Sequence, residues 1–393
     1  YNAIGSDEKG TADVFIADVK FRDASYARTE LDTAITAWVT DSTAATATYG
    51  HISNWNVSNV TNMDELFSDK YDFNENISNW DVSNVTSMYR MFFNARNFNQ
   101  EIDSWDVSKV TNMRLMFYYA WAFNQEIDSW NVSKVTNMEK MLDSAKVFNK
   151  SLNSWDVSNV TNMHSMFQTA SAFNGNIADW DVSQVTDLAY LFKNATSFNG
   201  DISGWNTSNV TTMQHMFHTA SAFNNDLNSW NVSQVTDMVQ IFQSCGQFNQ
   251  PLSNWNVSSV TTMSSAFAGT ANFNQSLNSW NVSNVVEMGA MFNSSGKFNG
   301  DISAWNVSNV TSMSYMFHRC YVFNSNISGW DVSSVKVLSN MFRDAPAFNA
   351  DISSWNVSSV TTMQSMFANY LGPGPDNYPN SFNQDISGWP IVG

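Results

Sequence analysis

Tryptophan returns every 25 residues along most of this 393-residue chain, and this period limits the folds that the chain can adopt. The residues that keep the period without interruption are Trp55, Trp80, Trp105, Trp130, Trp155, Trp180, Trp205, Trp230, Trp255, Trp280, Trp305, Trp330 and Trp355. A fixed repeat of 20 to 50 residues is typical of solenoids, because one repeat cannot bury its apolar face alone and stacked neighbours bury it together. We therefore expect one domain of about 14 rungs at 51–393, the last at Trp389.

Each repeat changes its apolar spacing once, as the unit that starts at Trp80 illustrates. Trp80 and Val82 alternate with polar residues, which is typical of a short strand with one polar face. The apolar residues from Met88 to Ala95 follow the spacing i, i+3, i+4, i+7 of a helical stripe. We therefore predict an α/β repeat solenoid with one short strand and a short helix or helical turn in each rung.

The full repeat pattern reads V-T-x-M-x-x-M-F-x-x-A-x-x-F-N-x-x-I-x-x-W-[ND]-V-S over roughly residues 50 to 393. Its segment I-x-x-W-x-V-x-x-V has the spacing of the strand segment of leucine-rich repeats, with valine in place of the usual asparagine or cysteine. The pattern resembles the BspA-like surface-protein repeat family. This resemblance implies a leucine-rich-repeat-like solenoid that is secreted or lies on a cell surface, and it implies no catalytic residues.

Two segments depart from the repeat. Residues 1–50 lack it, and Leu31, Ala34, Ile35 and Trp38 have helical spacing, so we predict an N-terminal helical cap over the first rung. A Pro/Gly-rich insertion at 371–379 lengthens the last repeat and is either a binding loop or a tolerated surface insertion.

Charge and motif content exclude several classes of function. The net charge of −17 gives no basic surface for nucleic acid, and no apolar run is long enough to span a membrane. No catalytic fingerprint is present, so we do not expect an enzyme. His215 and His218 are three residues apart, but no further ligand completes a metal site. Cys245 and Cys320 lie three rungs apart, too far for a disulfide, and are expected to be buried free thiols.

The most regular polar surface is the predicted strand face, which carries Asx and Ser in every rung. We consider this face a candidate binding site. Its first residues along the chain are Asp81, Ser83, Asp106, Ser108, Asn131, Ser133, Asp156, Ser158, Asp181 and Ser183. Three ligands suit such a face: a glycan, a calcium ion held by Asp oxygens, or ice matched by hydroxyl rows. The alternative is that these side chains only solvate and hydrogen-bond a parallel ladder.

Asparagine recurs at two further positions. The Asn of each Phe-Asn pair is predicted to form a structural ladder between rungs, and a row of ligand contacts is the alternative. The first ladder residues are Asn74, Asn99, Asn124, Asn149 and Asn174. Sequons in predicted turns are glycosylation candidates if the protein is secreted by a eukaryote. These candidates are Asn59, Asn84, Asn159, Asn209 and Asn309.

Aromatic residues also gather outside the predicted core in the first rungs. They are Tyr71, Phe93, Tyr118, Tyr119 and Trp121. A contiguous aromatic patch on a surface marks a contact site, and the alternative is packing against the cap.

Together these features predict a non-catalytic extracellular protein with a structural or adhesive function. Our first hypothesis is a subunit of a surface fibre, sheath or appendage that assembles through protein–protein contacts into a filament. No cap sequence follows Trp389, which favours contacts through the end of the solenoid. The alternative is a monomeric recognition module that binds a glycan or a cell-surface protein on its Asx/Ser face.

Overall fold

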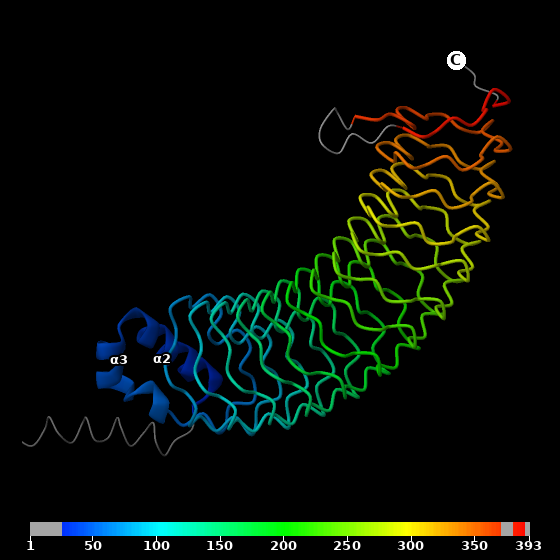
Figure 1. The fold of residues 1–393 in the computed structure, drawn as a ribbon. Coiled ribbons are helices and arrows are strands. Elements are labelled where there is room, and N and C mark those ends of the chain that lie inside the picture. The colour runs from blue at the N-terminus through cyan, green and yellow to red at the C-terminus, as the bar shows by residue number, and fades with distance from the viewer. Residues whose placement is uncertain (1–25, 371–379, 390–393) are drawn as a thin grey trace, which may run out of the picture. The chain divides into compact units, whose positions relative to one another are not determined.

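A computed structural model of the chain describes residues 26–370 and 380–389. These residues belong to two compact units that divide between Val160 and Thr161. Helices α2 (Arg28–Thr40) and α3 (Ser42–Tyr49) and the short 3-10 helix η1 (Ile52–Asn54) belong to the first unit (Figure 1). The insertion at 371–379 lies outside the described residues, as do residues 1–25 of the predicted cap.

Helix α2 covers the first rung with the apolar face that its sequence spacing indicates. The residues that it buries are Leu31, Ala34, Ile35 and Trp38. The Trp38 ring meets the Trp55 ring edge-on, with 5.8 Å between the ring centroids. Helix α3 follows at once because Asp41 ends α2 and caps α3: its carboxylate accepts the backbone N–H groups of Thr43 and Ala44. The two helices therefore seal the apolar end of the first unit.

Arg28 joins α2 to the backbone of the first rung. Its guanidinium donates to the carbonyl oxygens of Asn62 at 3.1 Å and Asp64 at 2.7 Å. One rung later, the corresponding carbonyl oxygen of Ser87 accepts the N–H of Met63 at 3.0 Å. Arg28 thus supplies the donors that a preceding rung would supply.

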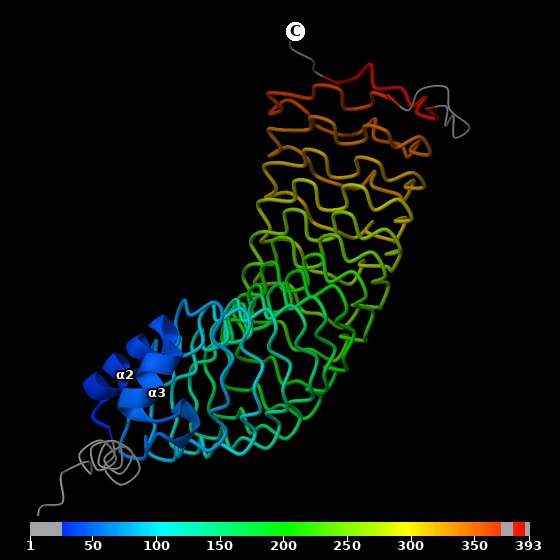
Figure 2. The same ribbon diagram turned by 90° about the vertical axis from the view of Figure 1, so that its left-hand side faces the viewer.

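Successive repeats pair in parallel through single bridges such as that between Asn62 and Ser87. Beyond the bridge, alternate N–H groups reach the next rung, as from Phe92 to the carbonyl oxygen of Met116 at 2.9 Å. The N–H groups between them close tight turns, as from Met91 back to Met88 at 3.1 Å. Both kinds of bond recur in the second unit, whose coils run parallel from green to red in Figure 2.

The segment from Met88 to Ala95 is a pair of tandem turns with left-handed residues, whereas its spacing predicts a short helix or helical turn. Arg90 and Asn94 have φ angles of 53° and 56°, in the left-handed region that an α-helix excludes. The physical reason is that alternate N–H groups bond to the next rung rather than to the residue four positions back. Among described residues after η1, the structure has bridges and turns but no α-helix.

The pairing between rungs also lies at a different place from the predicted strand. The bridges involve the column of Ser87, whereas Trp80 and Val82 precede a turn at Ser83 and take part in no bridge among the described residues. The leucine-rich-repeat-like class of the solenoid stays a prediction.

The core consists of aromatic and aliphatic columns in which each side chain packs on its equivalents. Trp205 and Trp230, for example, stack with 6.2 Å between their centroids. Each indole N–H donates at 2.8 to 3.2 Å to the carbonyl oxygen of an Ile or Leu in the preceding rung. The donors are Trp80, Trp105, Trp130, Trp155, Trp205, Trp230, Trp255, Trp280, Trp305, Trp330, Trp355 and Trp389. Tryptophan therefore ties the rungs together by stacking and by hydrogen bonding.

Cys245 and Cys320 lie buried in a column that alanine occupies in most rungs. Their thiols donate to the carbonyl oxygens of Phe217 and Phe292, at 3.0 and 2.9 Å. Thr270 uses its hydroxyl in the same way in this column. Cys and Thr side chains in this alanine column thus donate a hydrogen bond to the backbone of the preceding rung.

Replacing Arg28 by methionine tests the capping contact. We expect Arg28→Met to lower the free energy of unfolding of the first unit by about 1–2 kcal/mol, because a partly exposed charged donor to two carbonyl groups is lost. Arg28→Lys should recover less than half of this loss, since lysine lacks the planar fork. Urea titration monitored by tryptophan fluorescence measures both variants, and a wild-type midpoint for Arg28→Met would contradict the capping role.

Candidate functional site

The Asx and Ser residues of the predicted binding face form one turn in each rung. The Asx side-chain oxygen Oδ1 accepts the backbone N–H of the Ser two residues later, at 3.0 to 3.1 Å. The pairs are Asp81 with Ser83, Asp106 with Ser108, Asn131 with Ser133, Asp156 with Ser158, and Asp181 with Ser183. The face therefore lies on turns rather than on a strand, and each Asx stabilises its own turn.

A hollow of about 620 Å³ lies beside this face in the first unit. Its polar lining includes Asp103, Glu126, Asp128, Asn131 and Asp156. Serine hydroxyl groups already donate to three of these carboxylates, those of Asp103, Asp128 and Asp156. Within 26–370 and 380–389, no group of three or more His, Cys, Asp or Glu side chains is arranged to hold a metal ion.

The asparagines of the Phe-Asn pairs connect adjacent rungs. The side-chain Oδ1 of Asn74 accepts the backbone N–H of Asn99, and Oδ1 of Asn99 accepts the N–H of Asn124, both at 2.9 Å. The contact continues from Asn124 to Asn149 at 2.9 Å, and in the second unit Asn174 accepts from Asn199 at 2.8 Å. These amides thus serve the backbone of the next rung.

The sequon asparagines lie at turns, but most of their amide nitrogens are in use. Nδ2 donates to a Ser carbonyl oxygen of the preceding rung at 2.7 to 2.8 Å in Asn84, Asn159, Asn209 and Asn309. Asn59, the remaining candidate, is exposed. Because a glycan attaches at Nδ2, a sugar on any of the four would compete with an inter-rung hydrogen bond.

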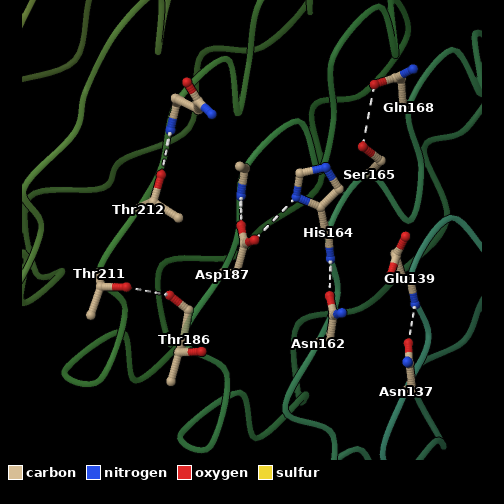
Figure 3. Close-up of polar contacts among 12 residues, drawn as sticks. Asn137, Glu139, Asn162, His164, Ser165, Gln168, Thr186, Asp187, Thr211 and Thr212 are labelled. Atoms are coloured by element: carbon tan, nitrogen blue, oxygen red, sulfur yellow. Dashed lines mark hydrogen bonds and ion pairs between the residues drawn. The ribbon is translucent and has the colours of Figure 1, made fainter.

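Threonine hydroxyl groups and one His–Asp pair lie along the bridge columns of the second unit. Figure 3 shows the hydroxyl of Thr211 donating to the carbonyl oxygen of Thr186 at 3.2 Å. Asp187 accepts from the backbone N–H of Ala189 at 2.7 Å, and its other oxygen lies 3.1 Å from Nδ1 of His164. The threonine hydroxyl protons therefore point at backbone oxygens, which distinguishes this row from a freely hydrated hydroxyl face.

The structure brings the aromatic residues of the predicted patch together on one face of the first unit. The rings of Phe93 and Tyr118 stack with 5.1 Å between centroids, and Tyr118 contacts Tyr119 at 4.2 Å. Tyr119 in turn meets Trp121 edge-on at 6.5 Å. Tyr71 and Tyr119 are 47% and 37% exposed, so both reach solvent, and Tyr71 lines a hollow together with Val39 and Ser42 of the cap.

Cations complete this patch, and sequence reasoning missed them. The Arg96 guanidinium lies between Tyr71 and Trp121, 4.6 and 4.4 Å from the two ring centroids. Lys146 lies 4.7 Å from the Trp121 ring, and Arg90 lies 4.0 Å from a further ring of the patch. The sequence does contain a signal for these contacts, because stacked rungs place residues 25 positions apart in one column. The residues with this spacing are Tyr71, Arg96, Trp121 and Lys146.

His215 and His218 also come together, in the second unit. Their Nδ1 atoms are 3.2 Å apart, and the His215 ring stacks on Tyr190 with 4.6 Å between centroids. Burial and the charge of Lys193 lower the pKa of both imidazoles, that of His218 to about 4. Both rings are therefore neutral near pH 7.

The Asx turns predict a specific response to acid. Hydrogen bonds from the Ser hydroxyl and backbone N–H lower the pKa of Asp106, Asp156 and Asp331. Their stabilising contribution is thus complete above the unfolded-state pKa of about 4 and is lost as the pH falls through the lower folded-state values.

We therefore expect the triple variant Asp106→Asn, Asp156→Asn and Asp331→Asn to lose less thermal stability than wild type between pH 7 and pH 3. Asparagine occupies this column in other rungs, such as Asn131, so the turns should form in the variant. Calorimetry at both pH values measures the difference, and equal losses in the two proteins would disprove the assignment.

A search among curated proteins found no match to the chain. In the part that the structure describes, no helix is long and apolar enough to cross a membrane. A family model matches the chain in four tandem and partly overlapping segments, at residues 33–155, 145–253, 236–345 and 297–392. Because these matches cover most of the sequence, the chain belongs to the DUF285 family, described as a Mycoplasma protein of unknown function.

Proposed function

We propose that this protein is a non-catalytic structural or adhesive component outside the cell, and that it assembles by protein–protein contacts through its aromatic patch. The patch consists of Tyr71, Phe93, Tyr118, Tyr119 and Trp121. The resemblance to BspA-like surface proteins supports the extracellular location, and the parallel 25-residue rungs support a leucine-rich-repeat-like solenoid.

The observation that carries the proposal is the contrast between this patch and the rest of the repeat surface. The recurrent polar side chains bond within the fold: the Asx side chains to their own turns, and the Asn and Thr side chains to neighbouring rungs. The patch departs from the repeat, since most later rungs carry small or polar residues in the columns of Tyr119 and Trp121, as at Thr169 and Ser171. Exposed Tyr and Trp flanked by Arg are the residues that dominate the binding energy of protein interfaces.

Charge supports contacts with proteins over contacts with nucleic acid. The chain carries a net charge of −17, yet Arg90, Arg96 and Lys146 all lie over rings of the patch. Arg90 is paired with Glu65, so Arg96 and Lys146 are the cations that reduce the repulsion between two acidic molecules at the contact. A second copy of the chain or another acidic protein therefore suits the patch.

One observation favours the alternative, a recognition module that binds a glycan. The hollow beside Asn131 and Asp156 offers carboxylate, amide and hydroxyl groups at one place, which suits hydrogen bonding to sugar hydroxyls. A calcium ion bridging sugar and carboxylates would be a variant of this proposal, with the Asp side chains that line the hollow as ligands.

Particle size distinguishes the two proposals. We expect light scattering and negative-stain microscopy to show assemblies of the wild-type protein. The variant Tyr119→Thr, Trp121→Ser should raise the concentration needed for assembly at least about 30-fold, because interface hot spots contribute about 2 kcal/mol or more. Both substitutions introduce residues that later rungs carry in the same columns, so the fold should tolerate them.

Tyr321→Ser is the matched control, because Tyr321 is similarly exposed and occupies the Trp121 column in the second unit. It should leave assembly unchanged. Particles of one chain's mass at all concentrations would overturn the assembly proposal, and glycan binding that is lost on Asp128→Ala would then favour the recognition module.

A further inference from the structure

The two histidines of the second unit are held at the two ends of one tight turn. His215 has a φ of 56°, and its carbonyl oxygen accepts the N–H of His218 at 3.1 Å. The imidazole of His215 is fixed further by its stack on Tyr190, with the ring planes 13° apart. Both rings therefore extend to the same side of the chain with their Nδ1 atoms facing each other, 3.2 Å apart.

This separation matches two cis ligands of one metal ion. Bonds from a first-row transition metal to imidazole nitrogen are about 2.0–2.1 Å long, so nitrogen atoms 3.2 Å apart subtend an angle of about 100° at the ion. That angle lies between the square-planar and the tetrahedral values. At this distance the two Nδ1 atoms form a hydrogen bond when one of them carries a proton. When each ring carries its proton on Nε2 instead, both Nδ1 lone pairs are available to a metal ion.

We propose that His215 and His218 chelate a transition-metal ion through their Nδ1 atoms, with Cu²⁺ bound more tightly than Ni²⁺ or Zn²⁺. Imidazole suits all three ions, and the order follows the general affinity of nitrogen ligands for divalent metals. Two protein nitrogens leave further positions of the ion open to water or to another ligand.

A further polar atom belongs to the next rung, the side-chain oxygen of Gln243. Gln243 follows His218 by one 25-residue period, and its backbone oxygen accepts the N–H of Thr219 at 2.7 Å. Its side-chain Oε1 is buried and has no hydrogen-bond partner among the residues that the structure describes. An amide oxygen can serve as a ligand of such an ion, so Gln243 is the candidate third ligand in the next rung.

The charge of Lys193 is expected to lower the affinity of the site for a metal ion. Its ammonium group lies over the Tyr190 ring, 5.1 Å from the centroid, and therefore close to the imidazole pair. A positive charge there opposes a bound cation. We expect removal of this charge to tighten metal binding, an effect that a merely structural role of the histidines would not produce.

Copper titration of the full chain provides the test. We expect calorimetry to show one Cu²⁺ site whose affinity falls at least tenfold in His215→Gln and in His218→Gln and rises severalfold in Lys193→Met. Electron paramagnetic resonance should show two nitrogen ligands in the wild-type protein and one in each glutamine variant.

His164→Gln is the control, because His164 is already engaged by Asp187 at 3.1 Å and should not contribute. Far-UV circular dichroism establishes that each variant is folded. Equal copper affinity and equal spectra for wild type and both glutamine variants would overturn the proposal. So would binding that depends on His164, because the metal would then sit elsewhere.

Discussion

The N–H groups of Arg90, Phe92 and Asn94 reach the next rung only because the turns between them adopt left-handed backbone. Each left-handed residue other than glycine costs about 1–2 kcal/mol, whereas a backbone hydrogen bond contributes about 1 kcal/mol net. The inter-rung bonds therefore roughly offset the strain. The net stability of the fold therefore comes from the buried Trp, Phe and Met columns, where each side chain contributes about 1.5–3 kcal/mol.

Much of the core follows from the sequence because burial depends on local spacing. The 25-residue period places Trp80 and its equivalents inside, and helical spacing identifies the residues that α2 buries. The path of the chain between Met88 and Ala95 could not be predicted in the same way. A pair of tandem turns and two turns of α-helix place apolar residues on one side of the chain at nearly the same spacing. Only the backbone hydrogen bonds to the next rung distinguish the two conformations.

The candidate site likewise has features that the sequence predicts and features that it does not. The aromatic residues of the patch are visible as departures from the repeat, and Tyr118 and Tyr119 do lie together. The position of Arg96 between two rings depends on how rungs stack, so it becomes visible only when residues 25 apart are treated as neighbours. The role of the Asx side chains was harder still to predict, because an exposed carboxylate that binds a ligand and one that caps its own turn have identical sequence patterns.

The direction of the inter-rung bonds gives each stack an electrical polarity. From Met88 onward, alternate N–H groups point toward the next rung and the carbonyl groups point back, so their peptide dipoles add as they do in a helix. Oppositely directed bonds such as that from Thr86 to Thr61 cancel part of this sum. The net negative end is the carbonyl edge that faces α2, where Arg28 provides a cation. A shortened protein that begins at a later rung would therefore need a positive charge at its first carbonyl edge as well as an apolar lid.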